Sequence, residues 1–141
     1  MDKHSPEIRS YNMSMIKSSG TKPEEMVRKY LFSKGLRYRK NVKDLPGKPD
    51  IVLRKYKTIV FVNGCFWHGH TKCRYFVMPK SNVDFWDDKI HKNIDRDKKV
   101  YQELTDAGWN VIVVWECQLK KNKRKNTLEY LYYNILRNIR D

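Results

Sequence analysis

The stretch from Asp50 to Cys73 reads DIVLRKYKTIVFVNGCFWHGHTKC, and it decides the fold. Two runs rich in β-branched residues, 50–53 and 58–62, are separated by a short basic turn. Residues of this kind favour strands, so the pattern predicts a hairpin in the centre of a sheet. A loop with several candidate metal ligands begins where the second run ends, and loops at strand ends commonly carry function.

That loop combines soft and borderline metal donors at short spacing. Cys65, His70 and Cys73 lie within it, and Cys117 lies far downstream. Together these side chains could close a tetrahedral zinc site with three cysteines and one histidine. The alternative is that the cysteines are small buried hydrophobes, an interpretation that we favour for Cys117 taken alone. For the others, a polar turn containing glycine favours zinc, and His68 would stay outside the shell with a ring that titrates near neutrality.

The cysteine count and the apolar runs indicate the cellular compartment. A total of 3 cysteines, an odd number, argues against a disulfide framework and for a reducing environment. An apolar run such as 59–62 is far too short to span a bilayer, and the polar N-terminus does not resemble a cleavable leader. We therefore expect a cytoplasmic protein without a membrane partner.

The charge balance predicts a polyanionic partner. Lysine and arginine number 30 against 16 aspartate and glutamate, which gives a net charge of +14. The basic residues gather in two clusters, 28–40 and 120–125. Either cluster alone could be a solvated surface or a flexible loop, but both clusters together with the total charge favour nucleic acid.

The remaining elements are predicted from apolar periodicity, capping signals and helix breakers. A first helix, which carries Met13 and Ile16, is expected between residues 5 and 20. The other expected elements are a helix between a capping box at 21–24 and a stop at Gly35, a strand over 36–40, a long helix that ends at Gly108, a strand over 111–115 and a helix over 128–139. This order predicts one α/β domain spanning residues 1–141, in which helices flank a mixed central sheet.

Five short segments, taken together, indicate a protein family more specifically than any single segment does. They are Leu45-Pro46-Gly47-Lys48-Pro49-Asp50, Gly64-Cys65-Phe66-Trp67-His68, Phe85-Trp86, Asp95-Arg96-Asp97 and Val114-Trp115-Glu116-Cys117. A Pro-Asp pair by itself usually marks a turn. Read together, the segments resemble the very short patch repair (Vsr) endonucleases of the restriction-endonuclease-like PD-(D/E)xK superfamily. The resemblance implies a restriction-endonuclease-like core with one structural zinc site.

The resemblance implies a Mg²⁺-dependent DNA endonuclease, and hard Mg²⁺ suits phosphodiester cleavage with oxygen ligands. Members of this family nick one strand 5′ to the thymine of a T:G mismatch, which arises when 5-methylcytosine deaminates. The implied partner is double-stranded DNA with that mismatch, and mismatch-repair proteins are further candidates. A monomer suffices for a nick at an asymmetric mismatch. The implied cofactors are a catalytic Mg²⁺ and a structural Zn²⁺.

The resemblance also implies roles for individual residues. Asp50 would be the principal Mg²⁺ ligand, with the main-chain carbonyl of Val62 as a second ligand, and Glu24 would hold a water on the metal. The choice of Glu24 over the adjacent glutamate rests on helix register alone. His68 would be the general base or proton shuttle, oriented by Asp97. Without the resemblance, Asp97 would be interpreted as part of an ion pair on a helix surface.

The same comparison implies the zinc ligands and the DNA contacts. The zinc ligands would be Cys65, His70, Cys73 and Cys117, which would clamp the loop that bears His68. The aromatics that would wedge between base pairs at the mismatch are Phe66, Trp67 and Trp86. Met13 and Ile16, in an N-terminal DNA-contacting arm formed by residues 1–20, would enter from the opposite groove. Apolar side chains usually belong to a core, but Phe66 and Trp67 lie on a polar loop.

Three departures from the family pattern bear on sequence context and rate. Val62 and Asn63 stand where the family more often carries threonine and histidine, Gly69 replaces a histidine, and one additional residue separates His70 from Cys73. Two alternatives stay open at this stage. One is a restriction-type enzyme that cuts both strands on the same fold, and the other is a zinc module that binds nucleic acid without catalysis.

Overall fold

The computed structural model describes residues 21–70, 73 and 77–138. It has a mixed sheet of four strands in the order β1-β2-β3-β4. The elements are α2 (Lys22–Ser33), β1 (Arg39–Lys40), β2 (Ile51–Leu53), η1 (Arg54–Tyr56), β3 (Thr58–Asn63), α3 (Val83–Asp106), β4 (Asn110–Trp115), η2 (Glu116–Leu119) and α4 (Arg124–Arg137). The predicted α/β class with a mixed sheet flanked by helices is confirmed. The helix expected between residues 5 and 20, with Met13 and Ile16, lies outside the described residues.

The predicted hairpin is the centre of the sheet. β2 pairs antiparallel with β3, and Ile51 lies opposite Val60. The turn between them is the 3₁₀ segment η1, which ends at Lys57 in the left-handed conformation with φ 50°. β4 pairs parallel with β3 along six residue pairs, from Thr58–Asn110 to Asn63–Trp115. A parallel neighbour requires a long crossover, and α3 provides it.

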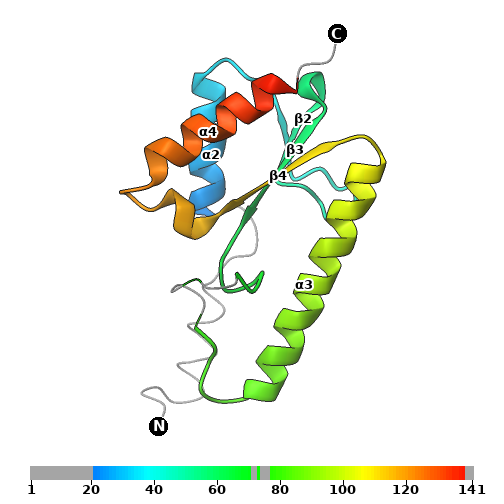
Figure 1. Ribbon diagram of the computed structural model, residues 1–141, viewed down its shortest axis with the longest axis vertical. Helices are drawn as coiled ribbons and strands as arrows, with labels where there is room; N and C mark the ends of the chain where they lie inside the picture. Colours follow the sequence, from blue (N-terminus) through cyan, green and yellow to red (C-terminus); the bar gives the residue numbers. More distant parts are fainter. Residues whose placement is uncertain (1–20, 71–72, 74–76, 139–141) are drawn as a thin grey trace.

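The sheet separates two cores, because successive strand residues point to opposite faces. On one face, α2 and α4 cover Ile51, Val60 and Val62. On the other face, Ile59 and Phe61 pack with the end of α3. Figure 1 shows α2 and α4 together on one side of the strands and α3 on the other. In the described part of the chain, no helix combines the length and apolar character needed to cross a bilayer.

The boundaries of β1 and α3 differ from the prediction. The strand expected over 36–40 is reduced to Arg39–Lys40, because Leu36 turns into the core beneath α2 and Asn41 has φ 51°. A short, charged edge strand is a common way to prevent pairing with another chain. The predicted long helix is α3, and it begins at Val83, before the first residue of its apolar face. It therefore also carries Trp86. Gly35, with φ 83°, follows the end of α2 and confirms the predicted stop.

Candidate active site and metal cluster

Asp50 lies at the end of the central hairpin, one residue before β2. Its Oδ2 accepts a hydrogen bond from the Val62 backbone N–H at 2.8 Å. Continuing the register in which Ile51 faces Val60 sets Pro49 opposite Val62. The N–H and C=O of one strand residue point to the same side, so the Val62 carbonyl also faces Pro49. Because proline has no N–H, Pro49 cannot donate a hydrogen bond to the Val62 carbonyl. The Pro-Asp pair therefore presents a carboxylate and directs a main-chain carbonyl toward the same end of the hairpin.

Glu24 is the buried carboxylate next to Asp50. Thr21 caps α2 by accepting a hydrogen bond from the Glu24 backbone N–H at 3.4 Å, which confirms the first half of the predicted capping box. The Glu24 side chain is only 1% exposed, and its Oε2 accepts a hydrogen bond from Arg28 Nη1 at 3.4 Å. The adjacent Glu25 is 53% exposed. The structure thus brings Glu24, and not its neighbour, to the end of the hairpin.

The two carboxyl groups raise the proton affinity of the site. The pKa of Asp50 is raised to about 7, mainly by burial. The charge of Glu24 and a hydrogen bond with Glu24 act in the same direction, whereas the Val62 N–H and the charge of His68 oppose them. Two carboxylates close together cannot both ionise without cost. A divalent cation between them would remove that cost, so the pair fits the oxygen-donor chemistry of Mg²⁺.

His68 is held by Asp97 from α3. His68 Nδ1 and Asp97 Oδ2 are 2.6 Å apart, and both side chains are largely buried. The loop that carries His68 closes on itself, because the His68 backbone N–H donates to the Gly64 carbonyl at 3.2 Å. With Nδ1 bonded to a carboxylate, Nε2 is the ring nitrogen available for proton transfer. The alternative interpretation of Asp97, a helix-surface ion pair with Arg96 or Lys98, does not hold, because its Oδ2 bonds the His68 ring and the side chain is only 18% exposed.

Tyr101 and Asn63 complete this site, and sequence reasoning did not identify either as a site residue. Asn63 Nδ2 donates a hydrogen bond to Tyr101 Oη at 2.7 Å. The pKa of Tyr101 is raised to about 12, mainly by burial and in smaller part by the charges of Asp97 and Asp50, against the hydrogen bond from Asn63. Tyr101 therefore lies close enough to feel the charges of both Asp50 and Asp97, which belong to the two carboxylate-containing pairs of the site. The signal that could have found it is its spacing of four residues from Asp97 on one helix.

The four predicted metal ligands lie together. The ligand atoms of Cys65, His70, Cys73 and Cys117 all lie within 4.8 Å of one another. Cys117 Sγ is 3.4 Å from His70 Nδ1, and the His70 ring stacks on Trp115 at 4.0 Å. Three sulfur donors and one imidazole nitrogen at this separation fit a single tetrahedral Zn²⁺. The interpretation of Cys117 as an isolated core residue is therefore wrong.

Burial of the cluster favours the protonated form of its thiols. Burial raises the pKa of Cys65 to about 12 and also raises that of Cys117. Burial lowers the pKa of His70 and keeps its imidazole neutral. A metal ion must displace the thiol protons to bind, so its affinity couples to pH and to folding. Through Cys117 in η2, the cluster joins the loop after β3 to the end of β4.

The aromatics of the loop and of α3 form one group that we call the aromatic patch, defined by Phe66, Trp67, Phe85 and Trp86. The Phe66 ring is 5.3 Å from Trp67 and 5.7 Å from Trp86. Phe66, Trp67 and Trp86 are half-buried, and none belongs to either of the two cores. Trp67 Nε1 is buried without a hydrogen-bond partner among the described residues. The structure thus brings the three predicted wedge aromatics together, whereas Met13 and Ile16 lie outside the described residues.

Gly69 lets the loop pack directly against α3. It has φ 57°, and a Cβ there would lie 2.6 Å from Ile94 Cδ1 and 2.8 Å from Ile90 Cγ2. We expect Gly69→Ala to lower the free energy of unfolding by about 2–3 kcal/mol, from backbone strain plus overpacking. Gly35→Ala is the matched control, because Gly35 has φ 83° but nothing within 4 Å of the added Cβ. It should cost about 1 kcal/mol. Equal midpoints in urea unfolding for the two variants would contradict close packing at Gly69.

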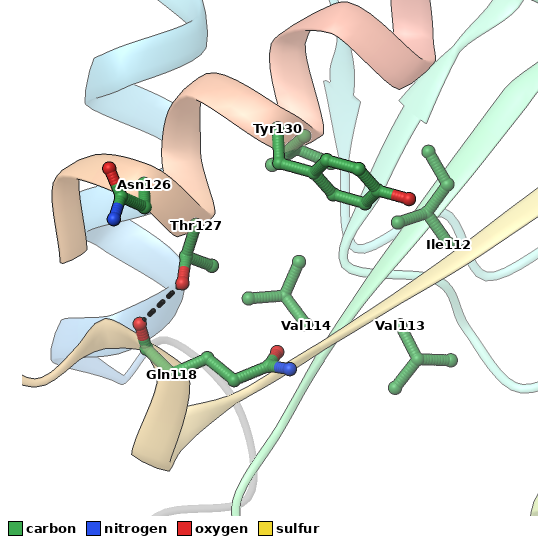
Figure 2. Close-up of a pocket in the computed structure, with 8 residues that line it drawn as sticks. Ile112, Val113, Val114, Gln118, Asn126, Thr127 and Tyr130 are labelled. Carbon is green, nitrogen blue, oxygen red and sulfur yellow. Dashed lines mark hydrogen bonds between the residues drawn. The ribbon is translucent and has the colours of Figure 1, made fainter. Parts of the chain in front are cut away.

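A separate cavity lies between β4 and α4. It has a volume of about 400 Å³ and contains no acidic, histidine or cysteine side chain among its lining residues. Figure 2 shows Ile112 and Val114 on one side and Tyr130 and Thr127 on the other, with Thr127 bonded to the Gln118 carbonyl at 2.7 Å. This lining offers no carboxylate, imidazole or thiol that could bind a metal ion. The titratable groups described above lie at the hairpin end and not in this cavity.

Comparisons with known proteins place this geometry in context. The family model of the DNA mismatch endonuclease Vsr matches residues 1–74. The chain is 60% identical over 112 residues to the type II nicking enzyme V.NmeAIP of Neisseria meningitidis serogroup A, covering 79% of each chain. It is 48% identical over 118 residues to the type II nicking enzyme V.XorIIP of Xanthomonas oryzae, covering 84% of this chain and 86% of that one. It is 38% identical over 123 residues to the DNA mismatch endonuclease Vsr of Escherichia coli, covering 87% and 78%.

Proposed function

This chain belongs to the Vsr family of DNA mismatch endonucleases, and on that premise we propose that it nicks one DNA strand 5′ to the thymine of a T:G mismatch. The observation that carries the proposal is the juxtaposition of two pairs, Glu24 with Asp50 and His68 with Asp97, at one end of the central hairpin. A module that only binds nucleic acid has no use for this arrangement. Relatives whose names describe nicking enzymes favour a nick over a double-strand cut.

Asp50 and the Val62 carbonyl would hold a Mg²⁺ ion, and Glu24 would accept a hydrogen bond from a water beside it. The bound ion would polarise the scissile phosphate and stabilise the leaving oxygen. The raised pKa of Asp50 supports this assignment, because a cation held by the two carboxylates would offset the cost of ionising both. Arg28 Nη1 lies 3.4 Å from Glu24 Oε2, so its single positive charge offsets only one of the two negative charges of the pair.

His68 would act as the general base. Asp97 accepts the Nδ1 proton of the neutral ring, which fixes the tautomer and leaves Nε2 to take a proton from the attacking water. Asp97 would also stabilise the imidazolium that forms. The charge of His68 lowers the pKa of Asp50, which supports one shared reaction centre for the ring and the carboxylate.

The structural zinc would hold this base in place. The cluster of three cysteines and one histidine flanks His68 on both sides in sequence, with Cys65 before it and His70 after it. A tetrahedral ion fixes a short loop that contributes few residues to the core. Its role would be positional, and no step of the reaction requires it.

The aromatic patch would supply mismatch recognition. A mispaired step costs less to unstack than a paired one, and an inserted ring replaces part of the lost stacking. The half-buried rings and the solvent-exposed Phe85, 60% exposed, fit a surface that inserts into DNA. The excess of basic residues would neutralise phosphates, so binding should weaken with salt at a slope of about −0.9 per phosphate contact.

The test of the proposed function is cleavage of labelled duplexes that differ at one position. Duplexes with T:G or T:A are incubated with the enzyme, with Mg²⁺ present or withheld, and run on native and denaturing gels. We expect strand breaks on denaturing gels only, in the T:G duplex only, and with Mg²⁺ only. Equal nicking of both duplexes would overturn mismatch specificity, and fragments on native gels would identify a double-strand enzyme.

Substitution of Trp67 tests the recognition step separately. We expect Trp67→Ala to reduce the preference for T:G over T:A about 5- to 100-fold, because base–aromatic stacking contributes about 1–3 kcal/mol per base. Phe32→Ala is the control, since Phe32 is an aromatic of 59% exposure on α2, away from the patch. The ratio of the two nicking rates is the measurement. Unchanged discrimination in Trp67→Ala would count against wedging by this ring.

A further inference from the structure

The hydrogen bond between Asn63 and Tyr101 joins β3 to α3. β3 contains Val62, which binds Asp50, and α3 carries Asp97, which binds His68. Asn63 is the last residue of β3, 2% exposed, and its Nδ2 lies 2.7 Å from Tyr101 Oη on α3. The Tyr101 ring also packs on Phe61 of β3, with centroids 5.1 Å apart. Tyr101 thus connects the C-terminal part of α3 to the end of β3.

Each end of this contact lies close in sequence to a residue of the proposed site. Asn63 directly follows Val62, whose N–H binds Asp50. Tyr101 follows Asp97 by four residues on the same helix, so the two side chains share one face. Asp97 and Asp50 both influence the hydroxyl of Tyr101, which keeps its proton at neutral pH.

We propose that the Asn63–Tyr101 hydrogen bond is a positioning contact that sets the separation between the His68–Asp97 pair and the Asp50–Val62 pair. This inference rests on the proposed function of the site. His68 reaches its place through a loop and through Asp97 on α3, whereas Asp50 is fixed to the hairpin. A base and a metal ligand on separate elements need a connection between those elements, and a misplacement of about 1 Å can cost about 100-fold in rate. Asn63 and Tyr101 provide that connection through one buried hydrogen bond.

Tyr101→Phe is the decisive variant, because it removes only the hydroxyl and keeps the ring against Phe61. With the T:G duplex and Mg²⁺, we expect its kcat to fall about 10- to 100-fold, with KM and DNA affinity changed less than about 2-fold. Asn63→Ala should have the same effect. The double variant should be no slower than the slower single variant, because both remove the same contact. Tyr130→Phe, at a tyrosine of 69% exposure on α4, is the control and should keep the wild-type kcat.

The outcomes separate this inference from the proposed function. A wild-type protein that does not nick the T:G duplex overturns the proposed function. A wild-type protein that nicks, together with Tyr101→Phe at an unchanged kcat, overturns the positioning role alone. Additive losses in the double variant, or a change confined to KM, overturn it as well. Thermal unfolding of each variant accompanies the kinetics, and Tyr101→Phe decides alone if Asn63→Ala does not fold.

Discussion

Asp50→Asn should lower the nicking rate by at least about 1,000-fold while leaving DNA affinity within a few-fold of wild type. The substitution keeps the shape of the side chain and an oxygen that can accept from the Val62 N–H, which Asp50 Oδ2 now does at 2.8 Å. It removes the charge that would hold Mg²⁺ beside the scissile phosphate. Single-turnover nicking and filter binding on the same T:G duplex measure the two effects. Asp44→Asn, at an exposed loop position, is the control.

The same variant should be more stable than the wild type at alkaline pH when Mg²⁺ is absent. Burial raises the pKa of Asp50 to about 7 in the folded protein, from its ordinary value of 3.8. The folded state therefore binds a proton that the unfolded state has lost, and stability falls as pH rises between these values. Above about pH 7 the full cost of the buried charge is present, on the order of 4 kcal/mol for this shift, and asparagine removes it.

Urea unfolding at two pH values measures this cost. At about pH 8, Asp50→Asn should unfold at a higher urea concentration than the wild type, and near pH 4 the two should coincide. Added Mg²⁺ should stabilise the wild type at the higher pH and leave the variant unchanged, because a ligand stabilises only the form that binds it. A variant that is less stable than the wild type at both pH values would show that Asp50 is structural.

The central hairpin and the metal cluster could be predicted from sequence because each depends on local pattern. The β-branched runs on either side of 54–57 form β2 and β3 as expected. Donor type and short spacing predicted the set of Cys65, His70 and Cys73. Cys117 was harder, because its inclusion depends on β4 lying parallel to β3, so that both strands end at the same edge.

The choice of Glu24 over Glu25 illustrates what helical register can decide. In the structure, Glu24 shares its buried face with Val27 and Leu31, at spacings of three and seven residues. Glu25 instead pairs on the surface with Lys29 at 3.1 Å. The apolar periodicity of this helix therefore predicts the inward glutamate, provided that the carboxylate has a partner at the hairpin end.

The contact between Asn63 and Tyr101 could not be predicted from sequence. The apolar stripe of α3 assigned Tyr101 to the core, and its ring does pack on Phe61. Its hydroxyl, however, extends beyond the core to a residue 38 positions away. Periodicity indicates which face of a helix is buried, but it does not show which strand end that face meets.

Loss of one zinc ligand should affect both folding and activity. We expect Cys117→Ser to bind less than about a tenth of an equivalent of Zn²⁺, to lower the free energy of unfolding by at least about 3 kcal/mol and to abolish nicking even with Asp50 intact. The reason is that Cys117 is the one ligand contributed from beyond β4, with its Sγ 3.4 Å from His70 Nδ1. Without it, the loop that carries His68 is no longer tied to the far strand.

Metal content, unfolding and activity together distinguish a zinc ligand from a small core residue. A cysteine that only fills space would cost about 1 kcal/mol on replacement by serine and would leave the metal content unchanged. His91→Ala is the control, because His91 is an exposed histidine of α3 that bonds the Asp87 carbonyl at 2.8 Å, outside the cluster. It should retain zinc, stability and nicking. If Cys117→Ser keeps a full equivalent of Zn²⁺, the cluster does not bind the metal through this thiol. If it loses the metal but still nicks at the wild-type rate, the zinc does not position His68.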